Sequence, residues 1–506
     1  MTGTFYDYDV IVVGAGNTAL LTALRAHEFG VKVLVLEIAP KEKRGGNAYY
    51  TTGIYRIVHN GLEDIIDLIP DLTEEERNII ISPYTADDYF REYSKVTEGM
   101  VDPSLMEMVV ERSTDAIRWM VKKQNVKMEL TSNFVHRING KLHFLGEVPI
   151  SAKGAGAGLS DYLFDRVEKM EGIDLLYETG ARQLLLDEKG NVCGVKVKSK
   201  EGLRDIYARA VCLSCGGFEA NPAWRARYLG PTWDLAKVRG GKYNMGDGLK
   251  MALDMGAQPY GHWSCCHATF IDADAPQPSI KEDTDTTAKR LFIFGLIFNV
   301  NGERFLDEGE DHMDLTYARF GRTLLTQPDR MGFQLFDSKG YATITQGHVF
   351  HDYVHAPYTK ASSLGEMAEK LGMNPEKFTK TVEQYNMSIK PGGKTNLYKI
   401  ANASEDLHAE GIFPAKSSCA FPLDTPPYYA FPVCCGITFT YGGLKVNRHA
   451  QVVDINENPI SGLYASGEII GGLFYHNYPG ATGQLTGAVF AHIAGKRAAE
   501  YSKRFK

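Results

Sequence analysis

The chain has 506 residues, with 55 basic against 62 acidic side chains and a net charge of −7. This length exceeds one ordinary hydrophobic core, so we expect two or three domains. The slightly acidic balance gives no electrostatic reason to expect nucleic acid or an anionic membrane as a partner, and the chain contains no run of 18 apolar residues that could span a bilayer.

The N-terminal 37 residues read as strand, glycine turn, helix, strand and acidic residue. Gly14 lets the chain turn sharply after the first strand, Gly16 lets the backbone approach a pyrophosphate, and Ala19 keeps helix and strand close. Glu37 ends the second strand, where a carboxylate can hold ribose hydroxyls. This pattern predicts a dinucleotide-binding βαβ unit. The strand begins too soon after Met1 to leave room for a secretory leader, so we expect a cytoplasmic protein.

The segment after this unit is predicted to be mostly helical. A polar glycine-rich loop is expected at 41–47, helices up to about residue 124, a flexible glycine loop at 153–158 and a helix at 159–167. Four strands should follow, at 174–177, 181–187, 192–197 and 208–213. The turn at 189–191 makes the middle pair a hairpin.

The cysteines give no sign of a metal site. Cys212 and Cys215 form a C-x-x-C that could be redox-active, but they lie where a strand runs into a glycine turn, which favours buried strand residues. The doublets 265–266 and 434–435 lack the spacing of zinc or iron–sulfur ligands. We expect no metal.

The second half of the chain predicts an inserted domain. A polar stretch at 272–289 precedes a strongly apolar segment at 291–299, which we interpret as a strand pair. Strand and turn patterns return at 443–446, 451–454 and 462–468, before a final helix from about 483 to 503. We therefore expect a nucleotide-binding domain formed by residues 1–270 and 415–506, with a second domain, 271–414, inserted between them. Ligand sites are common at such an interface.

Five glycine motifs occur in a recognisable order: the Gly14 fingerprint, Gly45-Gly46-Asn47, Cys215-Gly216-Gly217-Phe218, Asn244-Met-Gly-Asp247-Gly and Gly467-Glu468. Together they resemble the flavin-binding elements of the fumarate reductase and succinate dehydrogenase flavoprotein superfamily. The resemblance covers almost the whole chain. It implies an α/β fold, with a Rossmann-like FAD-binding domain and an inserted α+β capping domain, and it implies FAD as the cofactor.

The resemblance also implies how the residues would contact FAD. The diphosphate would lie over the Gly14 turn and the adenosine ribose on Glu37, with Glu468 near the ribityl or pyrophosphate part. Some relatives attach FAD through a histidine close to the Gly45 loop, but residues 48–50 here are Ala-Tyr-Tyr, so we expect non-covalent FAD. The predicted cofactor-binding residues are Gly14, Gly16, Asn17, Ala19, Glu37, Gly45, Gly46, Asn47, Gly216, Gly217, Asp247, Gly467, Glu468, and Gln484 and Leu485 at the start of the last helix.

Two branches of the superfamily are the most similar. The segments 316–322 and 472–480 resemble tricarballylate dehydrogenases, and the Tyr-x-x-Phe-Gly-Arg and Tyr-Pro-Gly motifs within them also resemble 3-ketosteroid Δ1-dehydrogenases. Carried over from the ketosteroid motifs, Tyr317 would be the base and Tyr478 the donor to the substrate carbonyl. A phenol has a pKa of about 10, so the base role requires a nearby positive charge. Arg322 or Arg319 could supply it.

The substrate side departs from the fumarate reductase pattern. The arginine that serves as the acid in fumarate reductases, expected shortly after Gly302–Glu308, is missing here. Fumarate reductases also have a carboxylate-binding histidine and an arginine near the C-terminus. This chain has Thr438 or Phe439 in place of the histidine and Tyr478 in place of the arginine. His267 does match a substrate-side histidine of the superfamily, and Arg56 could lie near this site. The predicted substrate-contacting residues are Tyr50, Arg322, Phe439, Tyr441 and Gly480, whose aromatic character favours a larger, less charged substrate than fumarate.

We therefore expect an FAD-dependent dehydrogenase that acts on a CH–CH bond adjacent to a carbonyl or carboxyl group, in the desaturating direction or its reverse. A tricarballylate-like polycarboxylate dehydrogenase or a fumarate-type reductase is the nearest alternative, and an electron-transfer flavoprotein subunit is the alternative from another class. A small-molecule substrate and an electron acceptor are the expected partners. The sequence identifies neither of them, nor the oligomeric state.

Overall fold

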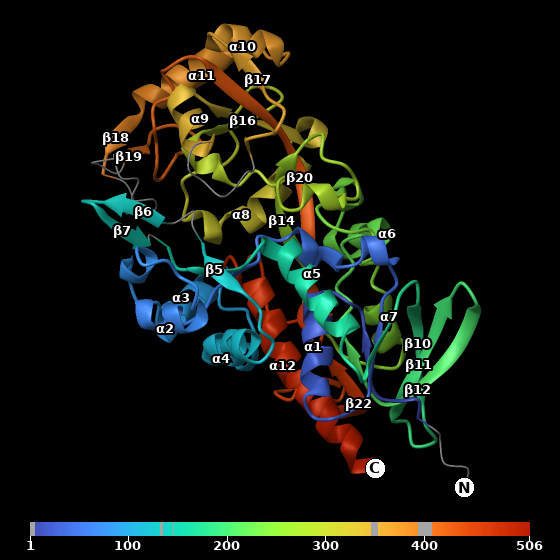
Figure 1. Cartoon of the computed structure of the whole chain (residues 1–506). Helices are drawn as coiled ribbons and strands as arrows, with labels where there is room; N and C mark the ends of the chain where they lie inside the picture. Colours follow the sequence, from blue (N-terminus) through green and yellow to red (C-terminus); the bar gives the residue numbers. More distant parts are fainter. Residues whose placement is uncertain (1–5, 132–134, 145, 346–352, 393–406, 506) are drawn as a thin grey trace.

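The computed structural model describes residues 6–131, 135–144, 146–345, 353–392 and 407–505. Residues 1–5, on which the expectation of no leader rests, lie outside the described residues. The α/β fold expected from the sequence is confirmed, because a sheet with parallel strands is built from both halves of the chain and is packed by helices (Figure 1). Among the described residues, none of the helices is long and apolar enough to cross a lipid bilayer.

The largest sheet contains eight strands and places β1 (Tyr8–Val13) at its centre, parallel to both β12 and β2. Val10, Ile11 and Val12 are fully buried, as expected for a strand covered on both faces. The order is β10-β11-β12-β1-β2-β9, with β22 on β12 and β21 on β22. The other strands of this sheet are β2 (Val33–Leu36), β9 (Ile173–Leu176), β10 (Gly180–Leu186), β11 (Val192–Ser199), β12 (Gly202–Leu213), β21 (Gln451–Val453) and β22 (Pro459–Ala465).

The predicted βαβ unit, hairpin and final helix are confirmed. The helix α1 (Asn17–His27) connects β1 and β2, and β10 and β11 form the antiparallel hairpin. The last helix, α12 (Thr482–Ser502), packs along α1 (Figure 1). This packing depends on glycine: a Cβ at Gly487 would lie 2.3 Å from Thr18 Oγ1, and one at Gly495 would lie 2.5 Å from the Thr22 carbonyl oxygen.

A second, six-stranded sheet joins the nucleotide-binding part to the rest of the molecule. Its long strand β20 (Tyr428–Leu444) pairs over most of its length with β14 (Pro259–Asp272), and its first part also pairs with β16 and β17. In Figure 1, β20 runs from the unit that carries α10 and α11 down to β14 and α8. The other strands are β13 (Lys237–Val238), β15 (Leu296–Asn299), β16 (Met331–Phe336) and β17 (Thr359–Ala361). The strand predicted at 443–446 starts within β20.

The unit beyond β15 has its own apolar core. Leu296, Phe298, Met367, Phe378 and Val382 belong to a cluster of buried side chains separate from the main core. The elements that contribute to it include α10 (Leu364–Lys370), α11 (Pro375–Met387), β18 (Ile389–Pro391) and β19 (Leu407–Ala409), whereas Ile344 of α9 (Ser338–Thr345) packs in the main core. A separate core is typical of an inserted domain. The boundaries at 271 and 414 stay a prediction, since β14 and β20 flank the insertion and contribute to the same sheet.

Two sequence predictions were wrong in detail. The segment 291–299 is a single 3-10 turn, Leu291–Phe294, followed by β15, because a continuously buried apolar run carries no periodicity that separates turn from strand. The predicted flexible loop at 153–158 is largely the start of α5 (Ala155–Glu168). Its glycines serve packing: a Cβ at Gly156 would lie 2.2 Å from the Ala48 carbonyl oxygen.

The stretch up to residue 124 is only partly helical, because short strands interrupt it. It contains α2 (Leu62–Leu68), α3 (Ala86–Val96), α4 (Pro103–Lys122), β3 (Ile54–Tyr55) and β4 (Ile80–Ile81). The remaining elements are β5 (Met128–Leu130), β6 (Val135–Ile138), β7 (Lys141–Phe144), β8 (Ile150–Ala152), α6 (Pro222–Trp224), α7 (Asp247–Asp254) and α8 (Tyr317–Phe320).

Candidate active site

One long pocket runs from the βαβ turn to the inserted unit, and most of the predicted site residues line it. Eleven of the fifteen predicted cofactor residues are in its wall, namely Gly14, Gly16, Asn17, Glu37, Gly46, Asn47, Gly216, Asp247, Gly467, Glu468 and Gln484. The three predicted catalytic residues, Tyr317, Tyr478 and His267, line the same pocket, as does Phe439. The structure therefore brings together residues that are more than 450 positions apart in the sequence.

The turn between β1 and α1 leaves space and free polar atoms at the helix start. Gly14 has φ +102°, and a Cβ there would lie 2.5 Å from the Ser214 carbonyl oxygen, so this position requires glycine. A Cβ at Gly16 would meet no atom nearer than 3.9 Å. Asn17 is buried, and neither polar atom of its side chain has a hydrogen-bond partner among the described residues. These features match a site for a phosphate at a helix N-terminus.

Glu37 lies in the pocket wall at the end of β2. Its Oε1 accepts a hydrogen bond of 2.7 Å from the backbone N–H of Ala39. Burial raises the pKa of this carboxyl to about 7, although backbone N–H groups of Ala39, Ala15 and Ile38 oppose the rise. A buried acceptor with an easily moved proton is suited to bind the hydroxyls of a ribose.

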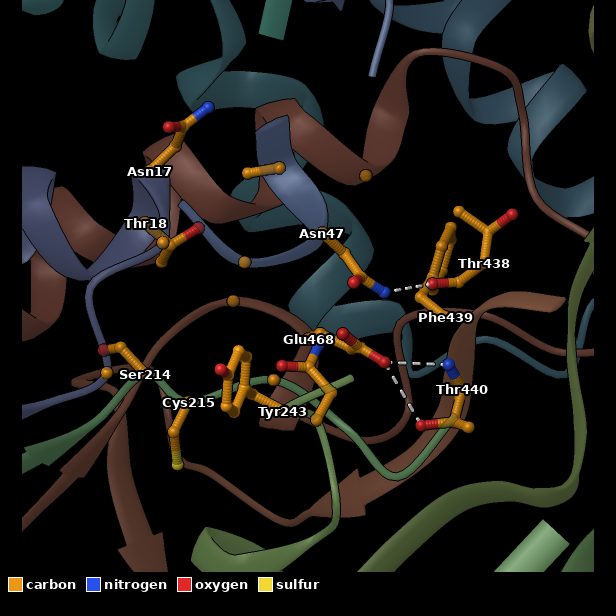
Figure 2. Close-up of a pocket in the computed structure, with 18 of the residues that line it drawn as sticks. Asn17, Thr18, Asn47, Ser214, Cys215, Tyr243, Thr438, Phe439, Thr440 and Glu468 are labelled. Atoms are coloured by element: carbon orange, nitrogen blue, oxygen red, sulfur yellow. Dashed lines mark hydrogen bonds between the residues drawn. The ribbon is translucent and has the colours of Figure 1, made fainter. Parts of the chain in front are cut away.

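Asn47 and Glu468 lie in the middle part of the pocket wall (Figure 2). Asn47 Nδ2 donates to the Thr438 carbonyl oxygen at 2.8 Å and to Glu219 at 2.5 Å. Glu468 accepts from the backbone N–H of Thr440 at 2.8 Å. Burial raises the pKa of both Glu219 and Glu468, and the contact between the two carboxyls adds to the rise at Glu219. Burial and the contact with Glu468 therefore make the protonated form of Glu219 more favourable than it would be in water.

The far end of the pocket holds two tyrosines in contact. The hydroxyls of Tyr317 and Tyr478 form a hydrogen bond, and the His267 ring lies 5.1 Å from each tyrosine ring, centroid to centroid. Phe439 closes this cluster, with its ring 5.0 Å from His267 and 5.3 Å from Tyr478. The tyrosines come from α8 and from the loop before α12, so only the folded chain makes them neighbours.

The electrostatics of this cluster keep its groups uncharged. Burial, and then the contact with Tyr478, raise the pKa of Tyr317 well above its usual value, and burial also raises the pKa of Tyr478. Burial and the charges of Arg239 and Arg290 lower the pKa of His267 well below its usual value. Two neutral phenols and a neutral imidazole therefore face the pocket at pH 7, and His267 Nδ1 has no hydrogen-bond partner among the described residues.

The positive charge in this region comes from two arginines that the sequence reasoning did not find. Arg239 and Arg290 line the pocket, are buried, and share the carboxylate of Asp285. Arg239 also donates to the Tyr50 carbonyl oxygen at 2.9 Å. Nothing in the local sequence marks either residue, since both lie in loops outside the recognised motifs.

The arginines expected to lower the pKa of Tyr317 are engaged elsewhere. Arg322 donates to Cys265 Sγ at 2.8 Å, and Arg319 pairs with Glu310 at the surface. The charge that opposes the rise in the pKa of Tyr317 is that of Arg290. The expectation of a lowered tyrosine pKa is therefore corrected: the effect of burial on the pKa of Tyr317 outweighs the opposing charge of Arg290.

Several other predicted residues lie behind the wall rather than in it, namely Ala19, Gly45, Tyr50, Gly217, Arg322, Tyr441, Gly480 and Leu485. Ala19 and Leu485 are fully buried in α1 and α12. Gly217 packs against Glu468, because a Cβ there would lie 2.2 Å from Glu468 Oε1. These residues shape the pocket without facing it.

The structure places Cys212 in a strand, as predicted, but Cys215 after it. Cys212 is buried in β12, whereas Cys215 follows that strand and lines the pocket. Burial raises the pKa of Cys215 to about 12, so its thiol stays protonated. Among the described residues, one group of three, Glu147, His312 and Asp314, brings possible metal ligands within 4.8 Å of one another, but the guanidinium of Arg56 already pairs with both carboxylates.

Comparison with known proteins agrees with this geometry. The family model described as "FAD binding domain" matches residues 9–485. The chain is 25% identical to an NADH:fumarate oxidoreductase of Klebsiella pneumoniae, over 98% of this chain and 48% of that protein, so it spans about half of that relative's length. It is 27% identical to a fumarate reductase (cytochrome) of Shewanella frigidimarina, over 98% of this chain and 78% of that protein. It is also 27% identical to a vinyl phenol reductase of Lactiplantibacillus plantarum, over 98% and 97%.

Two solved structures share the fold. A flavocytochrome c3 fumarate reductase in an open conformation superposes with a TM-score of 0.72 at 23% identity, covering 99% of this chain and 79% of that one. A 3-ketosteroid Δ1-dehydrogenase from Sterolibacterium denitrificans superposes with a TM-score of 0.72 at 21% identity, covering 99% and 100%. The predicted likeness to the fumarate reductase and ketosteroid dehydrogenase folds is confirmed. The likeness to tricarballylate dehydrogenases stays a prediction.

Proposed function

Because the chain belongs to the FAD binding domain family, we propose that it is an FAD-dependent oxidoreductase acting on a CH–CH bond next to a carbonyl or carboxyl group. The observation that carries this proposal is the continuity of the pocket wall, which runs from Gly14 and Glu37 to Tyr317 and Tyr478. A dinucleotide laid along this wall would place its two ends at two chemically different sites. One end has the features of a phosphate and ribose site, and the other has groups that can move a proton.

The nucleotide end fits FAD. The unpartnered amide of Asn17 and the open space over Gly16 accommodate a diphosphate, and the Glu37 carboxyl can accept from ribose hydroxyls. The only histidine in the described pocket wall is His267, which lies with the tyrosines at the opposite end from Glu37. We therefore propose that FAD is held non-covalently.

The reactive end supplies the proton chemistry. FAD, when bound, supplies two-electron transfer to or from a carbon atom of the substrate. A proton must then be added or removed at the neighbouring carbon, and we assign this step to the hydroxyl of Tyr317. Tyr478 is its hydrogen-bond partner and the donor to the substrate oxygen. The unpartnered Nδ1 of the neutral His267 offers a further hydrogen bond to the substrate.

The raised pKa values keep the proton on both tyrosine hydroxyls at neutral pH. A protonated phenol has a proton to give to a carbanion-like carbon but cannot accept one as a phenolate would, so the site at neutral pH is in the form that reduction of an activated C=C bond requires. The desaturating direction expected from the sequence would need an ionised Tyr317 and hence a higher pH.

The arginine pair favours a substrate with a carboxylate. Arg239 and Arg290 both line the pocket, and guanidinium groups are the usual bidentate partners of a carboxylate. An aromatic lining alone predicts a less charged substrate, and the two guanidinium groups revise that expectation. A polycarboxylate of the tricarballylate type and a monocarboxylate with an aromatic group are both compatible with this wall.

Anaerobic absorption spectroscopy tests the proposal. The photoreduced yellow protein is mixed with a panel of α,β-unsaturated carboxylates, enones and vinyl phenols, and the oxidised protein with the corresponding saturated compounds. Return of the oxidised flavin band with an unsaturated carboxylate is the expected result. If no member of the panel changes the flavin spectrum, while a partner protein exchanges electrons rapidly, the protein is an electron-transfer subunit instead.

A further inference from the structure

A buried arginine outside the pocket wall connects the two segments that carry the tyrosine pair. Arg56, directly after β3, is fully buried. Its Nε donates to the carbonyl oxygen of Gly480 at 2.8 Å, two residues after Tyr478. Its Nη2 lies 3.5 Å from Asp314 Oδ2, three residues before Tyr317. One guanidinium therefore holds both segments.

The same two segments are also joined by backbone contacts. The N–H of Gly480 donates to the Asp314 carbonyl oxygen at 2.8 Å, and Asn477 Nδ2 donates to the Leu315 carbonyl oxygen at 2.6 Å. The packing is tight, since a Cβ at Gly480 would lie 3.0 Å from the Asp314 Cβ. Small movements of either segment would therefore change the separation of the two tyrosine hydroxyls.

Arg56 is itself fixed from the opposite side. Its Nη1 donates to Glu92 Oε2 at 2.7 Å and to the Tyr84 hydroxyl at 3.0 Å, and it lies 3.6 Å from Glu147 Oε2. Tyr84 also donates to Glu92 at 2.6 Å. Glu92 belongs to α3, so the arginine transmits the position of a helix in the N-terminal third of the chain to the tyrosine pair.

We propose that Arg56 is a positioning residue, which holds the segments of Tyr317 and Tyr478 so that their hydroxyls meet. This inference rests on the proposed function only for its catalytic consequence. The contact between the hydroxyls is a property of the protein itself and can be measured without a substrate. A planar guanidinium can make these directed contacts at once, whereas the ammonium of lysine cannot.

The test replaces Arg56 by lysine, which conserves the positive charge, in the FAD-bound protein. Tyrosine labelled with ¹³C at Cζ reports hydroxyl hydrogen bonding, and the Tyr317→Phe and Tyr478→Phe variants assign the two resonances. We expect both resonances to move in Arg56→Lys, and we expect kcat to fall by about tenfold to a hundredfold while FAD affinity stays within about twofold. Glu147→Gln, which removes a carboxylate that contacts Arg56 but lies on neither tyrosine segment, should leave both resonances and kcat unchanged.

The alternatives give different results. If Arg56 acts only through its charge, Arg56→Lys leaves the resonances in place, and the proposal is overturned. If Arg56 serves only global stability, the melting temperature falls without a resonance shift, which overturns it as well. Should Arg56→Lys fail to fold, Asp314→Asn removes one contact while the pair with Glu92 remains, and both resonances are again expected to move, because a displaced Tyr317 hydroxyl alters the hydrogen bond that it shares with Tyr478. Failure to find a substrate would contradict the proposed function but not the resonance result.

Discussion

The two ends of the pocket are built in different ways. The phosphate and ribose features of the nucleotide end lie in one short stretch of chain, in which Gly14, Gly16, Asn17 and Glu37 follow each other within 24 positions. The tyrosine end collects side chains from six separate segments, those of Arg239, His267, Arg290, Tyr317, Phe439 and Tyr478. The first end is therefore set by local geometry, and the second by how distant segments pack. Mutations should separate the two: changes at one end should affect FAD binding, and changes at the other should affect turnover.

The largest effect is expected at the tyrosine pair. Tyr317→Phe removes the group assigned to proton transfer and should lower kcat by about 10²- to 10⁴-fold. Tyr478→Phe should lower it less, because the proton-transferring hydroxyl remains. The absorption spectrum and the FAD dissociation constant should stay unchanged in both variants. Steady-state kinetics beside a fluorescence titration with FAD measures this, and a large loss of FAD binding would show that the two ends are not separable.

The second-largest effect is expected at the arginine pair, Arg239 and Arg290. Arg239→Met removes one of the two guanidinium groups in the pocket wall, so KM for a carboxylate substrate should rise by about a hundredfold. The same variant should have little effect on a neutral enone. A comparison of kcat/KM for a carboxylate and its methyl ester checks this. Equal losses for both compounds would contradict a carboxylate site.

Two glycines test the nucleotide end. Gly16→Ala places a Cβ in open space, so the FAD-free protein should keep its melting temperature while FAD affinity falls about tenfold or more. Gly14→Ala is the matched control. At Gly14 the backbone has a φ of +102°, and an added Cβ would lie 2.5 Å from the Ser214 carbonyl oxygen. This substitution should therefore lower the free energy of unfolding, by at least about 1–3 kcal/mol. If Gly16→Ala leaves FAD affinity intact, the diphosphate does not lie over this turn.

The smallest effect concerns Glu37 and pH. Ribose hydroxyls donate to the ionised carboxylate, whose pKa without FAD is raised to about 7, so FAD affinity should increase as the pH rises toward 7 and level off above it. The stability of the FAD-free protein should depend on pH in the opposite direction. Because the pKa of Glu37 is higher in the folded than in the unfolded protein, the free energy of unfolding should fall as the pH increases from about 4.5 to about 7. Glu37→Gln should flatten both dependences, which titration calorimetry and thermal melts can follow.

Eleven of the fifteen residues that the sequence predicts for the cofactor line the pocket, because glycine spacing and an acidic strand end reflect backbone geometry. The sequence also found Tyr317, Tyr478 and His267, through short motifs carried over from a resemblance. It missed Arg239 and Arg290, since a side chain contributed by an irregular loop leaves no periodic or spacing signal. It assigned the positive charge to Arg322 or Arg319 instead, because sequence proximity to Tyr317 was the only available guide. In the fold, Arg322 faces Cys265.

The pH dependence of the proton-transfer step tests the central claim, that a neutral tyrosine pair faces the substrate at the end of the FAD pocket. The rate constant for oxidation of the reduced protein by an unsaturated carboxylate should be constant around neutral pH and should fall as the pH becomes alkaline. The reverse reaction should accelerate over the same range. Tyr317→Phe should remove both dependences. Reduction of the substrate that is fastest at alkaline pH, or an unchanged profile in Tyr317→Phe, would contradict the account.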